Sequence, residues 1–578
     1  MSKNQNKNDL KNEKSQGQTI VSGLAQGMIL LILLLIALIS VVFYWAMTEE
    51  KSLGGSMEAD ALAAQAQRQG EGAGLENEGM EDSIEIEGFR LETDRQGNHL
   101  FVNEREGYEL TIPEDLMKKI SLGDLCSSFG NEGMTLEIYM EHCKSDEEAA
   151  SYIHYSDSFL ENGQDHTPEL RKEMEVAGYT AHFTQWSRPV LKAIEGDKPY
   201  YVCLDILPGG NRVCTLLFRS AKPFRDEFLS IARSIRFEGG DYSVSGSGIV
   251  GLDGASLKTS ALEQKNLRDY WSEETKAVYL RYFSQDSPLT WGIFEPSAPN
   301  DFEKLDELEK TLEYQFDFLL CYKHFHRNGL PETYVEALEN AKKRNRILEL
   351  TLQTRFQEEG NMVYDILNGE FDQYLEDFAG AIRDTKQPVL FRLCNEMNGD
   401  WCAFSAFHTS RDTEIFRRLY QYVFQRFEEA GALPYVIWVW NPNERSFPQY
   451  DWNHAFRYYP GDQYVDIIGL TGYNTGTYYE GEEWRSFREI YEPIYREAVQ
   501  NFDKPLMITE FASSSVGGDK AQWIREMFEE IQNYDRIKVA IWWSGRDLDA
   551  EGNVARPYWL DEEKGTLKAF KDYVKTGE

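Results

Sequence analysis

The strongest constraint on the fold is a series of eight extended apolar runs that alternate with helix-like stretches within residues 263–578. In chain order they are TWGIFEP, QFDFLLCYKHF, RILELTLQ, PVLFRLCNE, YVIWVWNPN, VDIIGLTGYN, PLMITEFAS and KVAIWWSGRD. Strands that are apolar along their whole length are typical of parallel sheets, because both faces of such sheets are covered. Eight of them with helices between predict an α/β fold of the (β/α)8 barrel type.

An open, doubly wound sheet is the competing α/β architecture. That architecture usually carries a GxGxxG turn after its first strand or a phosphate-binding loop. Neither motif is present in residues 263–578. The barrel is therefore favoured, and its active site is expected where the strands end.

A second constraint lies near the start of the chain, where residues 27–47 contain no charged side chain. About 20 apolar residues suffice to cross a bilayer core of about 30 Å. Four lysines precede this run, Glu49 and Glu50 follow it, and no small-x-small cleavage site ends it. We expect a cytoplasmic segment at residues 1–18, a transmembrane anchor within residues 19–47, and an extracellular location for the rest. Cleavage of the run as a signal peptide is the alternative.

Three segments separate the anchor from the barrel. Residues 48–82 are rich in Gly, Ala, Gln and Glu and poor in large apolar residues, so we expect a flexible acidic linker. Residues 83–238 mix short strand-like runs such as TLEIYMEHC with helix-like stretches, which predicts an α+β domain on an antiparallel sheet. Residues 239–262 are rich in Gly and Ser and form a second expected linker. The sequence of the α+β domain indicates no chemistry.

Charge and cysteine content limit the partners. The chain has 60 Lys and Arg against 97 Asp and Glu, a formal net charge of -37, which disfavours nucleic acid as a partner. A neutral polysaccharide is compatible with this charge. The seven cysteines are irregularly spaced and include no CxxC pair. Cys203 and Cys214 flank an LPGGN turn and could face each other across a hairpin, whereas burial as small hydrophobic residues is the alternative.

Two acidic residues stand where barrel strands end. Glu396 ends the fourth apolar run and Glu510 ends the seventh. Two carboxylates at one rim of a barrel, surrounded by aromatic side chains, are what glycoside hydrolysis requires: one donates a proton to the leaving oxygen and the other acts on the sugar carbon. This chemistry needs no metal or organic cofactor. The alternative is a structural salt bridge with Arg392 as the partner.

Several motifs of residues 263–578 resemble glycoside hydrolase family 26, whose best-known members are β-mannanases. They are ILNGEFDQYLEDFA, PVLFRLCNEMNGDW, YVIWVWNPN, YYPGDQYVDIIGLTGYN and KPLMITEFASS. The resemblance implies that Glu396 is the general acid/base and Glu510 the nucleophile of a retaining double displacement. It further implies that Tyr473 orients Glu510 by a hydrogen bond and that Arg392 steadies the surroundings of the nucleophile.

Aromatic residues are the expected substrate contacts. The resemblance implies that Trp543, or alternatively Trp542, lies under the distorted sugar and that Trp401 lines the cleft near the acid/base. From the residues alone, Trp440 in WVWNPN is a further candidate for stacking on a sugar, with packing at the top of the barrel as the alternative. His324, at the end of the second run, could reach a substrate hydroxyl or be a structural histidine.

The sequence departs from the family pattern at three positions. Asn395 stands where the family usually has His, Thr471 replaces an acid in GLTGYN, and Phe404 stands where Trp is common. The amide of Asn395 can bind a sugar 2-hydroxyl, the position at which mannose and glucose differ. This departure argues against a strict preference for mannose. From the resemblance we expect a monomeric, mannanase-like enzyme that acts on a β-linked polysaccharide. A β-glucanase, a β-xylanase and a catalytically weakened glycan-binding protein are the alternatives.

Overall fold

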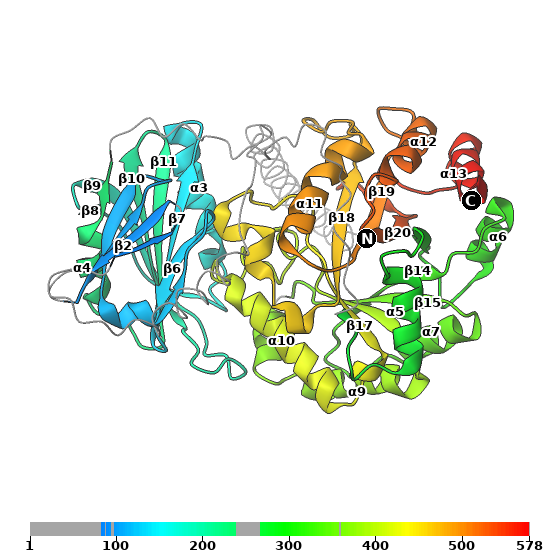
Figure 1. Cartoon of the computed structure of the whole chain (residues 1–578), viewed down its shortest axis with the longest axis horizontal. Helices are drawn as coiled ribbons and strands as arrows, with labels where there is room; N and C mark the ends of the chain where they lie inside the picture. The colour runs from blue at the N-terminus through cyan, green and yellow to red at the C-terminus, as the bar shows by residue number, and fades with distance from the viewer. Residues whose placement is uncertain (1–82, 87, 94–96, 239–265, 358–359, 577–578) are drawn as a thin grey trace, which may run out of the picture.

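The computed structural model describes the chain in two parts, which lie side by side in Figure 1. The described residues are 83–86, 88–93, 97–238, 266–357 and 360–576. Within these residues no helix combines the length and the apolar character that a membrane crossing needs. The predicted anchor at residues 19–47 and the two predicted linkers lie outside the described residues.

The larger part is a closed barrel of eight parallel strands, as the apolar runs predict. The strands are β13 (Thr290–Phe294), β14 (Phe318–His324), β15 (Ile347–Gln353), β16 (Val389–Leu393), β17 (Val436–Trp440), β18 (Ile467–Asn474), β19 (Leu506–Ser513) and β20 (Ile537–Trp543). β13 pairs in parallel with β20 and closes the ring. Seven of the eight predicted runs contain one of these strands whole, and the eighth contains all of β20 except Ile537.

Amphipathic helices surround the barrel. In α10 the buried side chains recur every three or four residues, from Ile415 to Phe427, so that one stripe faces the strands. The helices of the ring are α6 (Glu303–Leu312), α7 (Glu332–Lys343), α8 (Met362–Leu367), α9 (Asp372–Thr385), α10 (Thr413–Glu429), α11 (Phe487–Asn501), α12 (Lys520–Ile531) and α13 (Lys564–Thr576). A two-stranded sheet of β21 (Arg546–Leu548) and β22 (Val554–Pro557) follows the last barrel strand.

Helix α5 (Glu273–Phe283) closes the amino-terminal end of the barrel. Its Tyr279 and Phe283, together with Trp271, pack against side chains that point into the barrel, including those of Phe318, Leu390, Ile437, Met507 and Val539. The indole Nε1 of Trp271 donates a hydrogen bond of 2.9 Å to the carbonyl oxygen of Val436. This end of the barrel is solid, and a site can open only at the other end.

Within its described residues, the smaller part contains two antiparallel sheets, two α-helices and two short 3-10 helices. The five-stranded sheet consists of β1 (Ser83–Ile86), β2 (Phe89–Thr93), β3 (His99–Asn103), β4 (Tyr108–Ile112) and β12 (Arg236–Phe237). The seven-stranded sheet consists of β5 (Lys119–Ser121), β6 (Ser127–Gly130), β7 (Met134–His142), β11 (Arg212–Ser220), β10 (Tyr200–Gly209), β9 (Tyr179–Ser187) and β8 (Thr167–Val176). The α-helices are α3 (Asp146–Ser156) and α4 (Glu227–Ser234).

The seven-stranded sheet is covered on both faces. Successive side chains of a strand point to opposite faces. In β10, Val202 and Leu204 belong to the core shared with the five-stranded sheet and α4. Tyr201 and Cys203 belong instead to the core shared with α3 and the barrel. The smaller part is therefore packed onto the barrel by an apolar face of its sheet.

The suggested disulfide between Cys203 and Cys214 is wrong. In the hairpin of β10 and β11, Cys203 is opposite Leu217, and Cys214 is opposite Ile206. The two cysteines lie in different cores, so their side chains point to opposite faces of the sheet and cannot be bridged. All seven cysteines are free thiols, and six of them are buried.

Candidate active site

A cavity of about 940 Å³ lies at the carboxyl-terminal end of the barrel. Most of its floor comes from side chains at the ends of different strands. Six residues predicted from the sequence line it: Asn395, Glu396, Trp401, Tyr473, Glu510 and Trp543. The structure thus brings both acidic residues and three of the predicted aromatic residues to one site.

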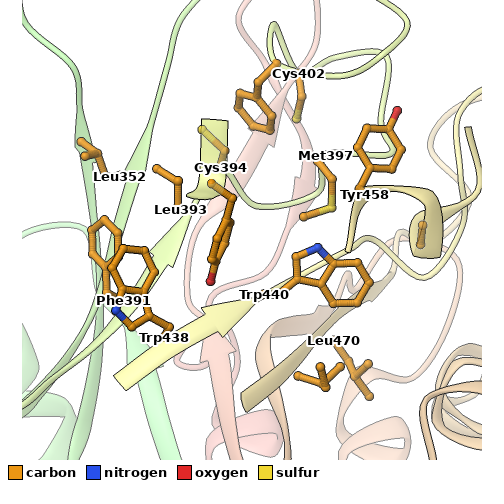
Figure 2. Packing of buried hydrophobic residues seen from close by; sticks show 14 of the residues in the cluster. Leu352, Phe391, Leu393, Cys394, Met397, Cys402, Trp438, Trp440, Tyr458 and Leu470 are labelled. Carbon is orange, nitrogen blue, oxygen red and sulfur yellow. The ribbon is translucent and has the colours of Figure 1, made fainter. Parts of the chain in front are cut away.

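A distorted turn directs Glu396 into this cavity. Beyond the end of β16, Cys394 has φ 50° and Glu396 has φ 57°. Left-handed backbone costs about 1–2 kcal/mol for each residue other than glycine. Two backbone hydrogen bonds hold this turn: Cys394 N–H donates to Leu352 O of β15 at 2.9 Å, and Glu396 N–H donates to Asn441 O, just beyond β17, at 2.8 Å. Cys394 and Met397 anchor the turn in the apolar core (Figure 2).

The surroundings of Glu396 favour its protonated form. Its carboxyl is half-buried, and Oε1 accepts a hydrogen bond of 2.5 Å from Nδ2 of Asn443. Burial and the charge of Glu510 raise the pKa of Glu396 to about 7, although the Asn443 amide and Arg392 act in the opposite direction. A carboxyl with a pKa near neutrality can donate a proton and later accept one.

A bulge in β19 directs Glu510 into the cavity. β19 has one residue more than β18 between the pairs Leu470–Ile508 and Thr471–Glu510. A bulge of this kind changes the alternation of side chains along the strand. As a result, Thr509 and Glu510 both face the interior of the barrel, where Thr509 Oγ1 lies 3.0 Å from Thr471 Oγ1. Regular alternation from Thr509 would turn Glu510 outward.

Four side-chain donors surround the buried carboxylate of Glu510. Its Oε1 accepts hydrogen bonds from Nη1 of Arg392 at 2.9 Å and from Nδ2 of Asn395 at 3.0 Å. Its Oε2 accepts from the hydroxyl of Tyr473 at 3.0 Å and from the hydroxyl of Tyr322. The hydrogen bond from Tyr473 was predicted and is present. These donors stabilise negative charge on Glu510 and fix the carboxylate in one orientation.

The predicted partner Arg392 is fully buried in the barrel. Its Nε donates to Thr351 Oγ1 at 2.8 Å and lies 3.1 Å from a carboxyl oxygen of Glu349. Burial raises the pKa of Glu349 to about 8, with a smaller contribution from Glu510. When Glu349 is neutral, Glu510 is the carboxylate that forms an ion pair with Arg392, at 2.9 Å. The salt bridge between Arg392 and Glu510 therefore exists, and it lies in the wall of the cavity.

The two adjacent tryptophans at the end of β20 face opposite ways. Trp543 lines the cavity, donates from Nε1 to the hydroxyl of Tyr322 at 3.2 Å and stacks on Phe294 with a ring separation of 5.2 Å. Trp542 is fully buried and donates to a backbone carbonyl at 3.0 Å. Of the two alternatives, Trp543 is the one that can contact a sugar. Gly545 permits its position, since a Cβ there would lie 2.4 Å from the Trp543 ring.

Trp401 forms part of the rim. Its side chain is 45% exposed, which is unusual for tryptophan, and its ring lies 5.1 Å from that of Phe447. Gly399 allows the chain to turn against the indole, because a Cβ there would lie 2.5 Å from the ring. An exposed aromatic face beside a carboxyl is suited to stacking on a pyranose ring.

Two predicted substrate contacts are not supported. Trp440 is one of the buried hydrophobic residues in Figure 2. It lies outside the barrel, packs against Tyr459 and Phe502, and does not line the cavity. The preference for a substrate contact at Trp440 was therefore wrong. His324 also lies away from the cavity lining, and burial and nearby Arg355 lower its pKa to about 4. It is a neutral, structural histidine.

Three residues of the site were missed in the sequence: Tyr322, Asn443 and Glu349. Tyr322 carried a usable signal, because it lies two residues after Leu320, which points into the barrel. Asn443 ends the quoted motif YVIWVWNPN but has no property that distinguishes it from a turn residue. Glu349 interrupts an apolar run, and a buried acid in such a run indicates a partner inside the barrel.

Part of the chain is similar to known proteins. Residues 350–542 match the model of glycosyl hydrolase family 26. Endoglucanase H of Acetivibrio thermocellus is 33% identical over 217 residues, which are 37% of this chain and 23% of that protein. A mannan endo-1,4-β-mannosidase of Bacillus subtilis is 28% identical over 137 residues, which are 23% of this chain and 32% of that protein.

Solved structures are similar at a lower level of identity. The catalytic domain of a GH26 endo-β-1,4-mannanase from Bacillus sp. JAMB-750 is 17% identical, with a TM-score of 0.41. The match covers 56% of this chain and 94% of that structure. This chain spans less than a third of the length of the two curated relatives named above.

Proposed function

We propose that this chain, of which residues 350–542 match the model of glycosyl hydrolase family 26, is a glycoside hydrolase that cleaves a β-linked polysaccharide with retention of configuration. The observation that carries the proposal is a pair of carboxyls in contrasting surroundings at one cavity. Glu396 has a pKa raised to about 7, and Glu510 accepts hydrogen bonds from four side chains. Such a contrast separates an acid from a nucleophile.

In the first step the carboxylate of Glu510 attacks the anomeric carbon of the bound sugar. At the same time Glu396 gives its proton to the glycosidic oxygen, the carbon–oxygen bond breaks, and the alcohol leaves. Tyr473, Tyr322 and Arg392 hold the attacking carboxylate in place, so that little reorganisation is needed. A covalent glycosyl ester on Glu510 remains.

In the second step Glu396 acts as the base. Esterification removes the negative charge of Glu510, which is one of the two causes that raise the pKa of Glu396. The pKa of Glu396 therefore falls after the first step, and the carboxylate can take a proton from water. The resulting hydroxide attacks the anomeric carbon, and Glu510 leaves as a carboxylate. The loss and return of the negative charge on Glu510 thus lower and raise the pKa of Glu396, so that it acts first as the acid and then as the base.

For the substrate we infer a β-1,4-mannan, on the basis of the motifs and of the similarity to a mannan endo-1,4-β-mannosidase. A β-glucan is the second candidate, because the relative with the higher identity of the two is named an endoglucanase. Asn395 is placed to distinguish the two sugars. Its Nδ2 is bound to Glu510, and its buried Oδ1 has no hydrogen-bond partner among the described residues. This oxygen can accept a bond from the sugar 2-hydroxyl.

We also propose that the enzyme is anchored in the membrane by residues 19–47 with the barrel outside the cell. The support is the uncharged run and the lysines before it. A protease added to intact cells should degrade the barrel and leave the N-terminal segment. Protection of the barrel until the cells are lysed would reject this orientation.

The experiment that tests the function is a product assay with the full chain in detergent. The polymers are mannan, glucomannan, mixed-linkage glucan and xylan. Glu510→Gln is the inactive variant, and Glu307→Gln, at an exposed glutamate of α6, is the matched acid-to-amide control. We expect the wild type and Glu307→Gln to release oligosaccharides from mannan, and Glu510→Gln to release none.

The products decide between the alternatives. Release from mixed-linkage glucan or xylan but not from mannan would replace the inferred substrate and keep the hydrolase. No release from any polymer, together with retained binding to one of them, would reject the hydrolase in favour of a glycan-binding protein.

A further inference from the structure

We propose that the domain of residues 83–238 is a structural part of the active site. It would hold the segment of residues 394–412, here called the acid/base loop, which begins at Cys394, carries Glu396 and Trp401, and ends at the first residue before α10. This inference rests on the proposed function. It assigns the domain a function in catalysis, in place of an independent binding or spacing function.

The C-terminal end of the acid/base loop is bound to the seven-stranded sheet. Asp412 is the N-cap residue of α10 and accepts a hydrogen bond of 3.0 Å from the backbone N–H of Glu414. Its other carboxylate oxygen accepts a hydrogen bond of 2.8 Å from the hydroxyl of Tyr201. Arg219 of β11 also donates to Asp412. One carboxylate thus joins the loop, the helix and the sheet.

Arg411 inserts into the domain itself. It is 1% exposed, and its Nη2 donates to the hydroxyl of Tyr152 in α3 at 3.1 Å. Its Nη1 lies 3.7 Å from a carboxylate oxygen of Asp157 and 3.7 Å from one of Asp205. Buried carboxylates need a cation nearby. The barrel supplies that cation, so the loop and the domain are coupled by charge as well as by packing.

The backbone beside Arg411 is held in an unfavourable conformation. Ser410 has φ 64° and Arg411 has φ 55°, and neither is glycine. Such residues persist only where their surroundings hold them. The surroundings here are the contacts of the Arg411 side chain with the domain and a hydrogen bond from its N–H to Ala406 O at 2.9 Å. Loss of the domain contacts would allow the loop to relax.

A second contact reaches the middle of the acid/base loop. The hydroxyl of Tyr155 in α3 donates to the carboxylate of Asp400, which directly precedes Trp401. The ring of Tyr155 also packs against Phe407 at 4.8 Å. The domain therefore contacts the loop both beside the rim tryptophan and at its C-terminal end. Glu510 is on β19, outside this loop.

This arrangement predicts a selective defect. When the loop relaxes, Glu396 moves away from the glycosidic oxygen, whereas Glu510 keeps the three donors that lie outside the loop: Arg392, Tyr322 and Tyr473. Protonation of the leaving group is then impaired, but attack on the sugar is not. For substrates whose leaving group needs no proton, the first step, which kcat/KM reports, should be spared. An interface that only stabilises the protein would affect both kinds of substrate alike.

The test uses the full chain in detergent and two substrates that share the same sugar. One is a β-1,4-linked oligosaccharide, a poor leaving group, and the other is a 2,4-dinitrophenyl glycoside, a good one. The variants are Arg411→Met and Tyr155→Phe. The control is Arg346→Met, a buried arginine that pairs with Glu309 at 2.7 Å at the start of β15, the opposite end of the barrel.

For Arg411→Met we expect kcat/KM, which reports the first step, to fall about 100-fold on the oligosaccharide and less than about tenfold on the dinitrophenyl glycoside. Tyr155→Phe should show the same selectivity at about three- to tenfold, and it lacks only one hydroxyl, so it tests the proposal even if Arg411→Met does not fold. Arg346→Met should change both substrates by the same factor.

Equal losses on both substrates in Tyr155→Phe and Arg411→Met, or no loss in either, would overturn the proposal. A wild type that hydrolyses neither substrate would reject the proposed function, and with it this inference. The two failures are therefore distinguished by the wild type alone.

Discussion

The raised pKa of Glu396 makes a prediction about stability. In the unfolded chain a glutamate has its ordinary pKa of 4.5, whereas in the folded protein burial and Glu510 raise it to about 7. Each pKa unit corresponds to about 1.4 kcal/mol, so the folded state is disfavoured by up to about 3 kcal/mol once Glu396 must ionise. Glutamine at this position has the same shape and no charge.

The sign follows from the two pKa values. Below pH 4.5 the carboxyl is protonated in both states, and it imposes no penalty. As the pH rises from 4.5 to about 7, the unfolded chain ionises while the folded protein stays protonated, and stability is lost; above about 7 both states ionise and the loss stays constant. Between pH 5 and pH 8, Glu396→Gln should therefore gain about 2–3 kcal/mol relative to the wild type, a value that water access to the half-buried carboxyl reduces.

Urea unfolding followed by tryptophan fluorescence measures this difference. The midpoints of the wild type and Glu396→Gln are compared at pH 5 and at pH 8, with Glu307→Gln as the exposed control. An advantage of Glu396→Gln that is the same at both pH values would show that the folded protein does not disfavour the ionised carboxyl. The assignment of Glu396 as the acid would then lose its physical basis.

Three further predictions concern activity. In a pH profile, kcat/KM should fall as the pH rises through about 7, because Glu396 must be protonated to start the reaction; a profile flat to pH 9 would exclude Glu396 as the acid. Tyr322→Phe removes a donor from Glu510, so kcat should fall about tenfold on activated and unactivated substrates alike, whereas a loss only in KM would place Tyr322 in substrate binding. Gly545→Ala would displace Trp543, so KM should rise several-fold in steady-state assays, with unchanged KM as the contrary result.

The barrel was predictable because its strands are buried on both faces. A continuous apolar run such as PVLFRLCNE can be recognised without knowing which side chain faces which way. The sequence alone therefore predicts it as a buried strand. Both acidic residues were found for the same reason, since each stands where such a run ends. Orientation was harder to predict. Trp440 was assigned to the substrate, although alternation from Val439, which faces the barrel interior, turns it outward.

Other features could not be predicted from the sequence. Alternation along β19 fails at Thr509 and Glu510, because the bulge depends on pairing with both neighbouring strands. The left-handed backbone at Glu396 likewise depends on hydrogen bonds from distant segments. The contacts of Arg411 join residues more than 200 positions apart and involve no motif. Long-range ion pairs of this kind leave no periodic signal in a sequence.

The seven-stranded sheet has a consequence for how this protein can change over generations. One of its faces, with Tyr201 and Cys203, is covered by the barrel side of the molecule. Recombination at residues 239–262 would give each product an uncovered aromatic surface, and large exposed patches of this kind promote aggregation. The domain is thus not a cassette that genomes can exchange between hydrolases. A barrel that received this domain would need a surface that covers the same face of the sheet.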